Sequence, residues 1–217
     1  MSSTLFRLDT SIRTEGSVTR AVADTLQGTI LEELGEGARV VRRDLAVEPV
    51  PADVWASAAL APEQGRSAEQ ERAARTAREL ADEVLSADVL VLGAPLYNFG
   101  VSQHFKTWVD TLITDPRLAP GQTPLADRPA FLVTARGGGY APGTPREGWD
   151  HATGWMRRIL VDVWGLDLDV IETELTLAEV NPQMAELREL ARAQLTESHD
   201  AARRGGRAVT LRLRSVA

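Results

Sequence analysis

The sequence contains no cysteine, and this absence excludes several kinds of protein at once. A chain without cysteine forms no disulfide, no thiolate metal site and no thiol nucleophile. Its carboxylates and its three histidines also lack the spacing of metal ligands, so we expect no metal site. Because this composition fits a reducing compartment, we expect a cytoplasmic location.

Long hydrophobic runs are absent as well. No stretch of the sequence approaches the roughly 20 consecutive apolar residues that a membrane-spanning helix needs. The N-terminal segment turns polar at Arg7 and Asp9, so it lacks the apolar core of a secretory signal. We therefore expect a soluble protein without a membrane partner.

Positive charge is scarce, since 24 Lys and Arg residues face 31 Asp and Glu residues for a formal net charge of -7. Proteins that bind nucleic acid usually carry a basic face or stripe. The basic run of this chain is confined to residues 203–214, and we interpret it as a solvated helix end and tail. We expect no nucleic-acid partner.

The remaining composition is typical of a globular domain, with 43% hydrophobic and 25% charged residues among 217. We predict one domain over residues 1–204, because no linker divides the chain. Residues 205–217 follow it, and there Val209, Leu211 and Leu213 alternate with polar residues. This period of two is typical of a strand, so the segment is either an added edge strand or a loose tail.

Hydrophobic periodicity predicts strands that alternate with helices. The expected strands are residues 4–8, 39–44, 89–92, 130–134 and 168–171, and the expected helices are 17–34, 63–86, 101–113, 149–164 and 182–203. Two proline-rich stretches, 44–62 and 115–128, are expected to be irregular. This alternation predicts an α/β protein with a parallel sheet covered by helices on both faces.

The loop after the first strand is the first candidate for ligand binding, because parallel sheets bind ligands beyond the carboxyl ends of their strands. It supplies the hydroxyls of Ser11, Ser17 and Thr19, with Val18 between the last two. Hydroxyls and free N–H groups at a helix N-terminus suit a phosphate group. Simple capping of the helix by Ser17 is the alternative interpretation.

The loop after the third strand contains two aromatic side chains beside an amide. Aromatic side chains pack against planar rings, and an amide both donates and accepts hydrogen bonds at a ring edge. The alternative is a loop whose aromatic residues close the core. The candidate binding residues here are Pro95, Leu96, Tyr97, Asn98 and Phe99.

The loop after the fourth strand contains three consecutive glycines, which let the backbone approach a ligand closely. Its candidate residues are Ala135, Arg136, Gly137, Gly138 and Tyr140. A flexible turn is the alternative for this loop alone. Together, the three loops predict a site for a mononucleotide with a flat head, and FMN is the expected cofactor.

At these loops the sequence resembles the FMN-dependent NADH-azoreductase family, which is related to the NAD(P)H:quinone reductases. The resemblance lies in Ser11, residues 17–19, residues 94–99 and residues 135–138, with further agreement at Asp44-Leu45-Ala46. It implies a flavodoxin-like, doubly wound parallel sheet of five strands in the order 2-1-3-4-5, with the FMN-binding domain spanning residues 1–204. It also implies a homodimer, and FMN phosphate contacts from Ser11, Ser17 and Thr19.

The resemblance further implies a ping-pong reaction, in which NADH or NADPH gives a hydride to the flavin before a quinone or azo compound is reduced. The flavin carries this chemistry, so no catalytic side chain is expected. Two alternatives stay open: a flavin-binding electron carrier without NAD(P)H turnover, and a dedicated biosynthetic flavin reductase. An α/β hydrolase is excluded, because the sequence lacks the G-x-S-x-G nucleophile motif.

Overall fold

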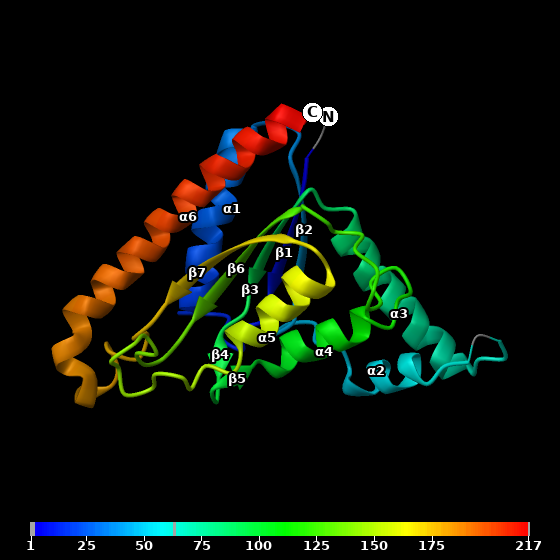
Figure 1. Cartoon of the computed structure of the whole chain (residues 1–217), viewed down its shortest axis with the longest axis horizontal. Coiled ribbons are helices and arrows are strands. Elements are labelled where there is room, and N and C mark those ends of the chain that lie inside the picture. Colours follow the sequence, from blue (N-terminus) through cyan, green and yellow to red (C-terminus); the bar gives the residue numbers. More distant parts are fainter. Residues whose placement is uncertain (1–2, 63, 217) are drawn as a thin grey trace.

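The computed structural model describes residues 3–62 and 64–216, and its centre is a sheet of parallel strands (Figure 1). The strands lie in the order β2 (Arg39–Asp44), β1 (Thr4–Asp9), β3 (Val89–Gly93), β6 (Pro129–Ala135) and β7 (Asp167–Thr173). All four neighbouring pairs are parallel. The predicted five-stranded order 2-1-3-4-5 is therefore confirmed.

Alternation along the strands divides the hydrophobic core into two layers. In β3, Leu90 and Leu92 belong to one layer, whereas Val89 and Val91 belong to the other. Successive side chains of a strand point to opposite faces, so a continuous apolar run indicates a strand that is buried on both faces. β3 is buried along its whole length, as its Val-Leu-Val-Leu sequence predicts.

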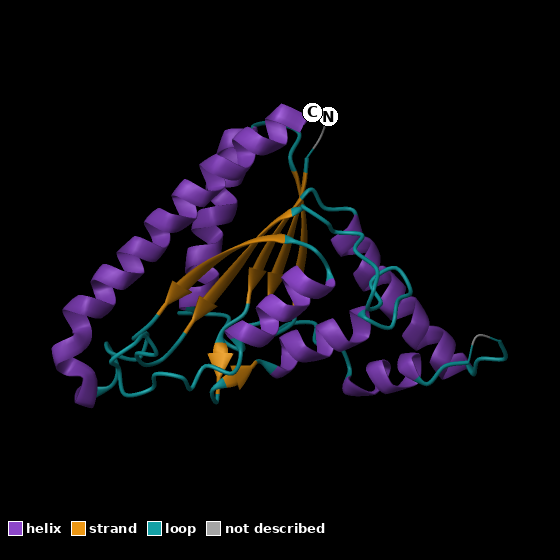
Figure 2. Ribbon diagram, in the orientation of Figure 1, coloured by secondary structure: helices purple, strands orange, loops and turns teal. Residues whose placement is uncertain are grey.

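Helices cover both faces of the sheet (Figures 1 and 2). The first layer packs α3 (Ala68–Leu85), α4 (Gln103–Leu112) and α5 (Thr153–Arg157) against the sheet. The second layer packs α1 (Val18–Leu34) and α6 (Arg188–Val216) against the opposite face. A short π-helix, η1 (Arg158–Val163), continues α5, and a 3-10 turn, η2 (Pro182–Leu187), precedes α6.

Two expected loops contain regular structure. The arm over residues 44–62 includes α2 (Ala52–Ala59), which begins directly after Pro51, a residue that suits a helix start. The loop after β3 forms a small hairpin of β4 (Leu96–Tyr97) and β5 (Gly100–Val101). The expectation of irregular structure was therefore wrong over residues 52–59, whereas residues 115–128 contain no helix or strand.

Three expected helices begin later than their hydrophobic patterns suggest, because polar side chains fix their N-termini. The helix expected from 101 starts after Ser102, whose hydroxyl accepts the N–H of Phe105 at 3.2 Å. The helix expected from 149 starts at Thr153, and Asp150 accepts the N–H groups of residues 152 and 153 just before and at this start. The helix expected from Glu63 starts after Ser67, and Glu63 itself lies outside the described residues.

The C-terminal segment is helical, so the prediction of an edge strand or a loose tail over residues 205–217 is wrong for residues 205–216. Residue 217 lies outside the described residues. α6 continues through this segment and packs beside α1 (Figure 1). Val209 and Leu213, which are four residues apart, belong to the second core layer. The apparent alternation therefore coincides with one face of a helix.

Candidate functional site

The carboxyl ends of β1, β3 and β6 bring the three predicted loops to one edge of the sheet, where they surround a pocket of about 370 Å³. That volume lies within the range of roughly 300–1,000 Å³ that is usual for small-molecule sites. All predicted site residues line the pocket except Arg136 and Gly138. Those that line it are Ser11, Ser17, Val18, Thr19, Pro95, Leu96, Tyr97, Asn98, Phe99, Ala135, Gly137 and Tyr140.

One end of the pocket is formed by residues 10–17, which we call the phosphate loop, and by the first turn of α1. Ser17 caps α1, since its hydroxyl accepts the N–H of Arg20 at 3.3 Å and donates to the hydroxyl of Ser11 at 3.0 Å. The N–H groups of Val18 and Thr19 have no acceptor in the described part of the chain, as is usual in a first helical turn. This end therefore offers free donors and hydroxyls at the positive end of a helix dipole.

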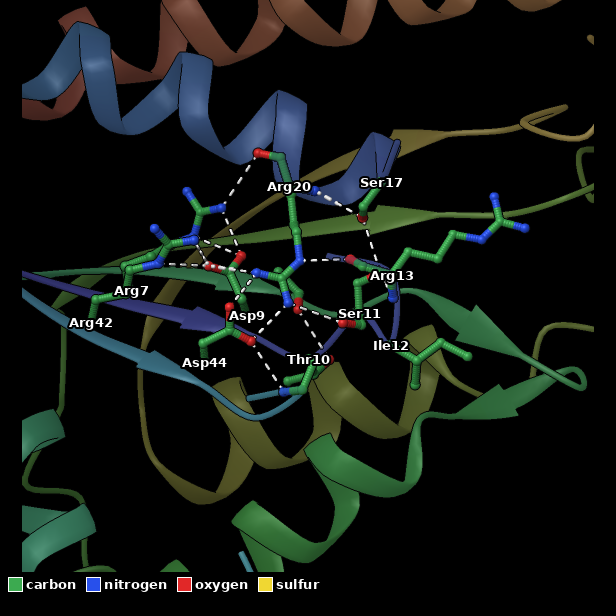
Figure 3. A network of polar contacts seen from close by, with 12 residues as sticks. Arg7, Asp9, Thr10, Ser11, Ile12, Arg13, Ser17, Arg20, Arg42 and Asp44 are labelled. Carbon is green, nitrogen blue, oxygen red and sulfur yellow. Dashed lines mark hydrogen bonds and ion pairs between the residues drawn. The ribbon is translucent and has the colours of Figure 1, made fainter. Parts of the chain in front are cut away.

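A network of buried charges lies behind the phosphate loop (Figure 3). Asp9, which is 1% exposed, accepts hydrogen bonds from Arg7 at 2.7 Å and from Arg42 at 2.8 Å. Arg20 pairs with Asp44 through both terminal nitrogens, at 2.5 and 2.7 Å. The hydrogen bond from Arg20 holds the pKa of Asp44 below its ordinary value, and Asp44 in turn raises the pKa of Arg20.

The hairpin of β4 and β5 forms the middle of the pocket wall. Its two turn residues, Asn98 and Phe99, have φ angles of 49° and 65°. Two successive positive φ angles match the turn that joins tight hairpins. For a bulky residue such as Phe99 this conformation costs about 1–2 kcal/mol. The hairpin thus bears strain that presents an aromatic ring and an amide at the pocket.

Aromatic rings and a guanidinium group form the other end of the pocket. Arg146 lies over the rings of Phe99 and Tyr140, with its Cζ atom 5.9 and 5.8 Å from their centroids. Trp149 packs edge-to-face against Phe99 at a centroid distance of 5.3 Å. This end therefore suits a flat ring, and it also contains a cation.

The two predicted residues that do not line the pocket, Arg136 and Gly138, belong to the glycine loop itself. The guanidinium of Arg136 forms ion pairs with Asp150, Glu172 and Glu174 at 2.7, 2.5 and 3.1 Å. Burial raises the pKa of Asp150, but hydrogen bonds from Thr153 and the charge of Arg136 outweigh burial and leave it below its ordinary value. Gly138 lies under Arg146, because a Cβ atom at residue 138 would be 2.5 Å from Nη1 of Arg146.

Sequence reasoning missed five residues that line the pocket, namely Arg13, Gly16, Arg146, Thr176 and Leu177. Thr176 and Leu177 follow β7, whose carboxyl end reaches the same edge of the sheet. The rule that pointed to the other loops applies equally to this one, so the signal was present. Arg146 lies in an irregular segment, where neither periodicity nor motif indicates a position.

The described part of the chain, residues 3–62 and 64–216, contains neither a metal-binding cluster nor a membrane-spanning helix. No group of three or more His, Asp or Glu side chains in it is placed to bind a metal ion. None of its helices is long and apolar enough to cross a membrane.

Comparison with known proteins identifies the family. Residues 3–197 match the family described as having a flavodoxin-like fold. A relative from Frankia casuarinae, named FMN-dependent NADH:quinone oxidoreductase, is 39% identical over 92% of this chain and 96% of its own length. A relative of the same name from Streptomyces coelicolor is 39% identical over 97% of this chain and 96% of its own length. The chain belongs to this flavodoxin-like family of FMN-dependent NADH:quinone oxidoreductases.

Solved structures share the fold of this oxidoreductase family member. An azoreductase from Bacillus anthracis superimposes with a TM-score of 0.73 at 22% identity, over 94% of this chain and 100% of its own. An FMN-dependent NADH-azoreductase from the same species, solved in complex with FMN, gives a TM-score of 0.72 at 17% identity, over 94% and 99% of the two chains. The predicted resemblance to this family is confirmed.

The residues at the pocket of this flavodoxin-like chain fit FMN chemically. A phosphate needs hydrogen-bond donors, and the N–H groups of Val18 and Thr19 lie beside the hydroxyls of Ser11 and Ser17. A flavin ring needs flat apolar walls and a polar edge, which Leu96 to Phe99 and Tyr140 supply.

Proposed function

We propose that this chain is an FMN-dependent NAD(P)H:quinone oxidoreductase that also reduces azo compounds. One observation carries the proposal: a single pocket combines free donors at the N-terminus of α1 with an aromatic and amide wall on a strained hairpin. FMN held in this pocket would supply hydride acceptance from the nicotinamide and two-electron reduction of the acceptor. Two relatives of the same family are named FMN-dependent NADH:quinone oxidoreductase, which supports the quinone part of the proposal.

The residues of the protein itself bind the cofactor, orient it and shield it from water. Ser11, Ser17 and Thr19 bind the phosphate through hydroxyls, together with the free N–H groups of α1. Asn98 fixes one edge of the ring by hydrogen bonding, and Phe99 and Tyr140 pack against the ring and exclude water. Gly137 is the glycine of this loop that lines the pocket, and its backbone N–H would stabilise negative charge on a bound ring.

We include a homodimer in the proposal. Three apolar side chains beside the pocket are exposed to solvent: Ile12 by 64%, Trp149 by 51% and Phe99 by 38%. Trp149 packs against Phe99 of the hairpin, and the backbone N–H of Ile12 donates to Tyr97 of the same hairpin. A second copy of the chain that covered this patch would also close the mouth of the pocket.

We also propose a cytoplasmic location, where NADH is available to the enzyme. The sequence has no cysteine, which is compatible with a reducing compartment. A fusion of the chain to a fluorescent protein would show the location directly, and a signal confined to the cell envelope would contradict this part of the proposal.

Reconstitution with flavin tests the function. The purified protein is mixed with FMN and desalted, and its visible spectrum is recorded before and after anaerobic addition of NADH and, separately, NADPH. We expect a retained absorption band near ~450 nm that bleaches with NADH, and a colour that returns on addition of a quinone or an azo dye. Free FMN passed through the same column is the control for incomplete desalting.

The other outcomes discriminate between the alternatives. Retained flavin that neither nicotinamide bleaches would indicate an electron carrier instead of a reductase. Bleaching that quinones and azo dyes do not reverse would indicate a dedicated reductase with another acceptor. If the protein retained no flavin at any concentration, the cofactor assignment would be wrong.

A further inference from the structure

We propose that Arg20, held by Asp44, is a positioning residue that orients the phosphate loop and so makes the protein select a phosphorylated flavin. This inference rests on the proposed function and extends it to residues outside the pocket. Neither Arg20 nor Asp44 lines the pocket. Their effect must therefore pass through the phosphate loop.

The position of Arg20 is unfavourable for a cation unless something compensates it. Arg20 is 7% exposed and lies in the first turn of α1, where the helix dipole repels positive charge. Compensation comes from Asp44, which it contacts at 2.5 and 2.7 Å, and from Asp9 at 3.6 Å. Because these carboxylates neutralise it, the guanidinium is not itself a free phosphate ligand.

The donors of Arg20 that face away from Asp44 bind backbone carbonyls of the phosphate loop. Its Nε donates to the carbonyl of Arg13 at 2.9 Å, and its Nη2 donates to the carbonyl of Ser11 at 3.0 Å. Figure 3 shows the guanidinium lying between the loop and Asp44. The planar guanidinium of Arg20 thus connects Asp44, at the carboxyl end of β2, to two peptide groups of the phosphate loop.

Because the peptide bond is planar, the contacts to the two carbonyls also fix the direction of the N–H groups that follow them in the chain. In a trans peptide the carbonyl and the next N–H point in opposite directions. When Arg20 draws the two carbonyls inward, the N–H groups of Ile12 and Thr14 point away from it. The N–H of Ile12 donates to the Tyr97 hydroxyl in the pocket wall at 3.2 Å, and that of Thr14 has no acceptor in the described part of the chain.

Asp44 is well fixed for this purpose. It is the last residue of β2 and lies opposite Asp9 of β1 in the sheet. Its Oδ1 also accepts the N–H of Ala46 at 3.1 Å, so its carboxylate has a defined direction. The Asp44-Leu45-Ala46 segment, which is part of the sequence resemblance to the family, thereby fixes the carboxylate that holds Arg20.

The test compares the affinities for FMN and for riboflavin, which lacks the phosphate. Dissociation constants are measured from flavin fluorescence for the apo form of the wild type and of R20M, R20K and D44N. For R20M we expect FMN affinity to fall by about 10–100-fold, the size of about one hydrogen bond that involves a charged group. Riboflavin affinity should change by less than about threefold, because the ring end of the pocket is unaltered.

R20K separates the geometry of the guanidinium from its charge. A lysine keeps the charge but lacks the fork that reaches Asp44 and both carbonyls, so we expect it to lose FMN affinity nearly as R20M does. R42M is the matched control. Arg42 also contacts Asp9, is half-exposed and makes no contact with the phosphate loop, so R42M should bind FMN like the wild type.

Several results would overturn the inference. These are an unchanged FMN affinity in R20M, an equal loss of FMN and riboflavin in R20M, full FMN affinity in R20K, or a loss in R42M as large as in R20M. Circular dichroism checks that each variant is folded, and if R20M is not, R20K and D44N decide. A wild type that bound neither flavin would instead refute the proposed function, and this inference with it.

Discussion

At the scale of single residues, Arg146 is a pocket-lining cation whose guanidinium has no ion pair or hydrogen bond in the described part of the chain. It is half-buried and lies over the rings of Phe99 and Tyr140, two side chains that also line the pocket. A partly desolvated and unpaired guanidinium favours a carboxylate or sulfonate in the ligand. Arg146 therefore favours acceptors that carry an acidic group.

Substitution R146M tests this preference while it retains a long apolar side chain. We expect kcat/KM for an azo dye with a carboxylate to fall by about 10-fold, and for the matched dye without it by less than about twofold. R13M is the control, because Arg13 lines the phosphate end of the same pocket and should leave the ratio of the two dyes unchanged. An equal loss for both dyes would mean that Arg146 acts by packing on the rings.

The sequence predicted the residues that stand directly after a strand, and it missed those that tertiary structure brings in. Tyr97 and Gly137 were found because the carboxyl edge of a parallel sheet is a known ligand position. Arg20 resembles any cation on a helix surface, and only the fold reveals that it is buried against Asp44. Arg136 was placed in the site by its neighbours in sequence, whereas its side chain turns toward Glu172 and Glu174.

At the scale of elements, α6 depends on two glycines in its interior. A Cβ atom at Gly205 would lie 2.7 Å from Phe131 of β6, and one at Gly206 would lie 2.9 Å from Thr29 of α1. Such distances are too short for a methyl group, so these glycines let α6 approach both the sheet and α1. The closest contacts of α6 therefore lie at two glycines, residues whose intrinsic helix propensity is low.

Substitution G205A should therefore destabilise the protein in spite of the higher helix propensity of alanine. We expect the free energy of unfolding in urea to fall by about 1–3 kcal/mol, which is typical of an overpacked core. The matched control is G28A in α1, where a Cβ atom meets nothing within 4 Å. There alanine should stabilise by about 0.5–1 kcal/mol. If both substitutions changed stability in the same direction, close packing at Gly205 would not be the cause.

These glycines also explain why the C-terminal element was mispredicted. Two adjacent glycines usually indicate the end of a helix, and the alternation of Val209, Leu211 and Leu213 with polar residues matches a strand. In the structure, Leu211 is 67% exposed whereas Val209 is buried, which is the pattern of a helix face. Packing of this segment against α1 favours the helix over a strand, and a local sequence pattern does not show tertiary packing.

At the scale of the whole molecule, the strand order was predictable because the apolar pattern of the strands and the connections between them indicate the same sheet. Strands that alternate with helices require crossovers, and a buried apolar run such as β3 must lie in the middle of the sheet. Whether the protein is a monomer or a dimer depends on its exposed apolar surface, and a sequence does not show which apolar residues remain exposed. The structure leaves an exposed apolar patch of Phe99 and Trp149, which pack on each other, and the exposed Ile12 is hydrogen-bonded to the same hairpin through its backbone N–H.

Substitution W149E tests whether this patch is the interface of a homodimer. A charge in a buried apolar interface is costly, so we expect the wild type to sediment at about twice 23.6 kDa and W149E as a monomer at micromolar concentration. L211E is the control, since Leu211 is also exposed and lies near the C-terminal end of α6, an end of the helix that lies away from the hairpin (Figure 1). If the patch also closes the pocket, the monomeric variant should release FMN faster than L211E does. A W149E dimer as stable as that of the wild type would place the interface on another face.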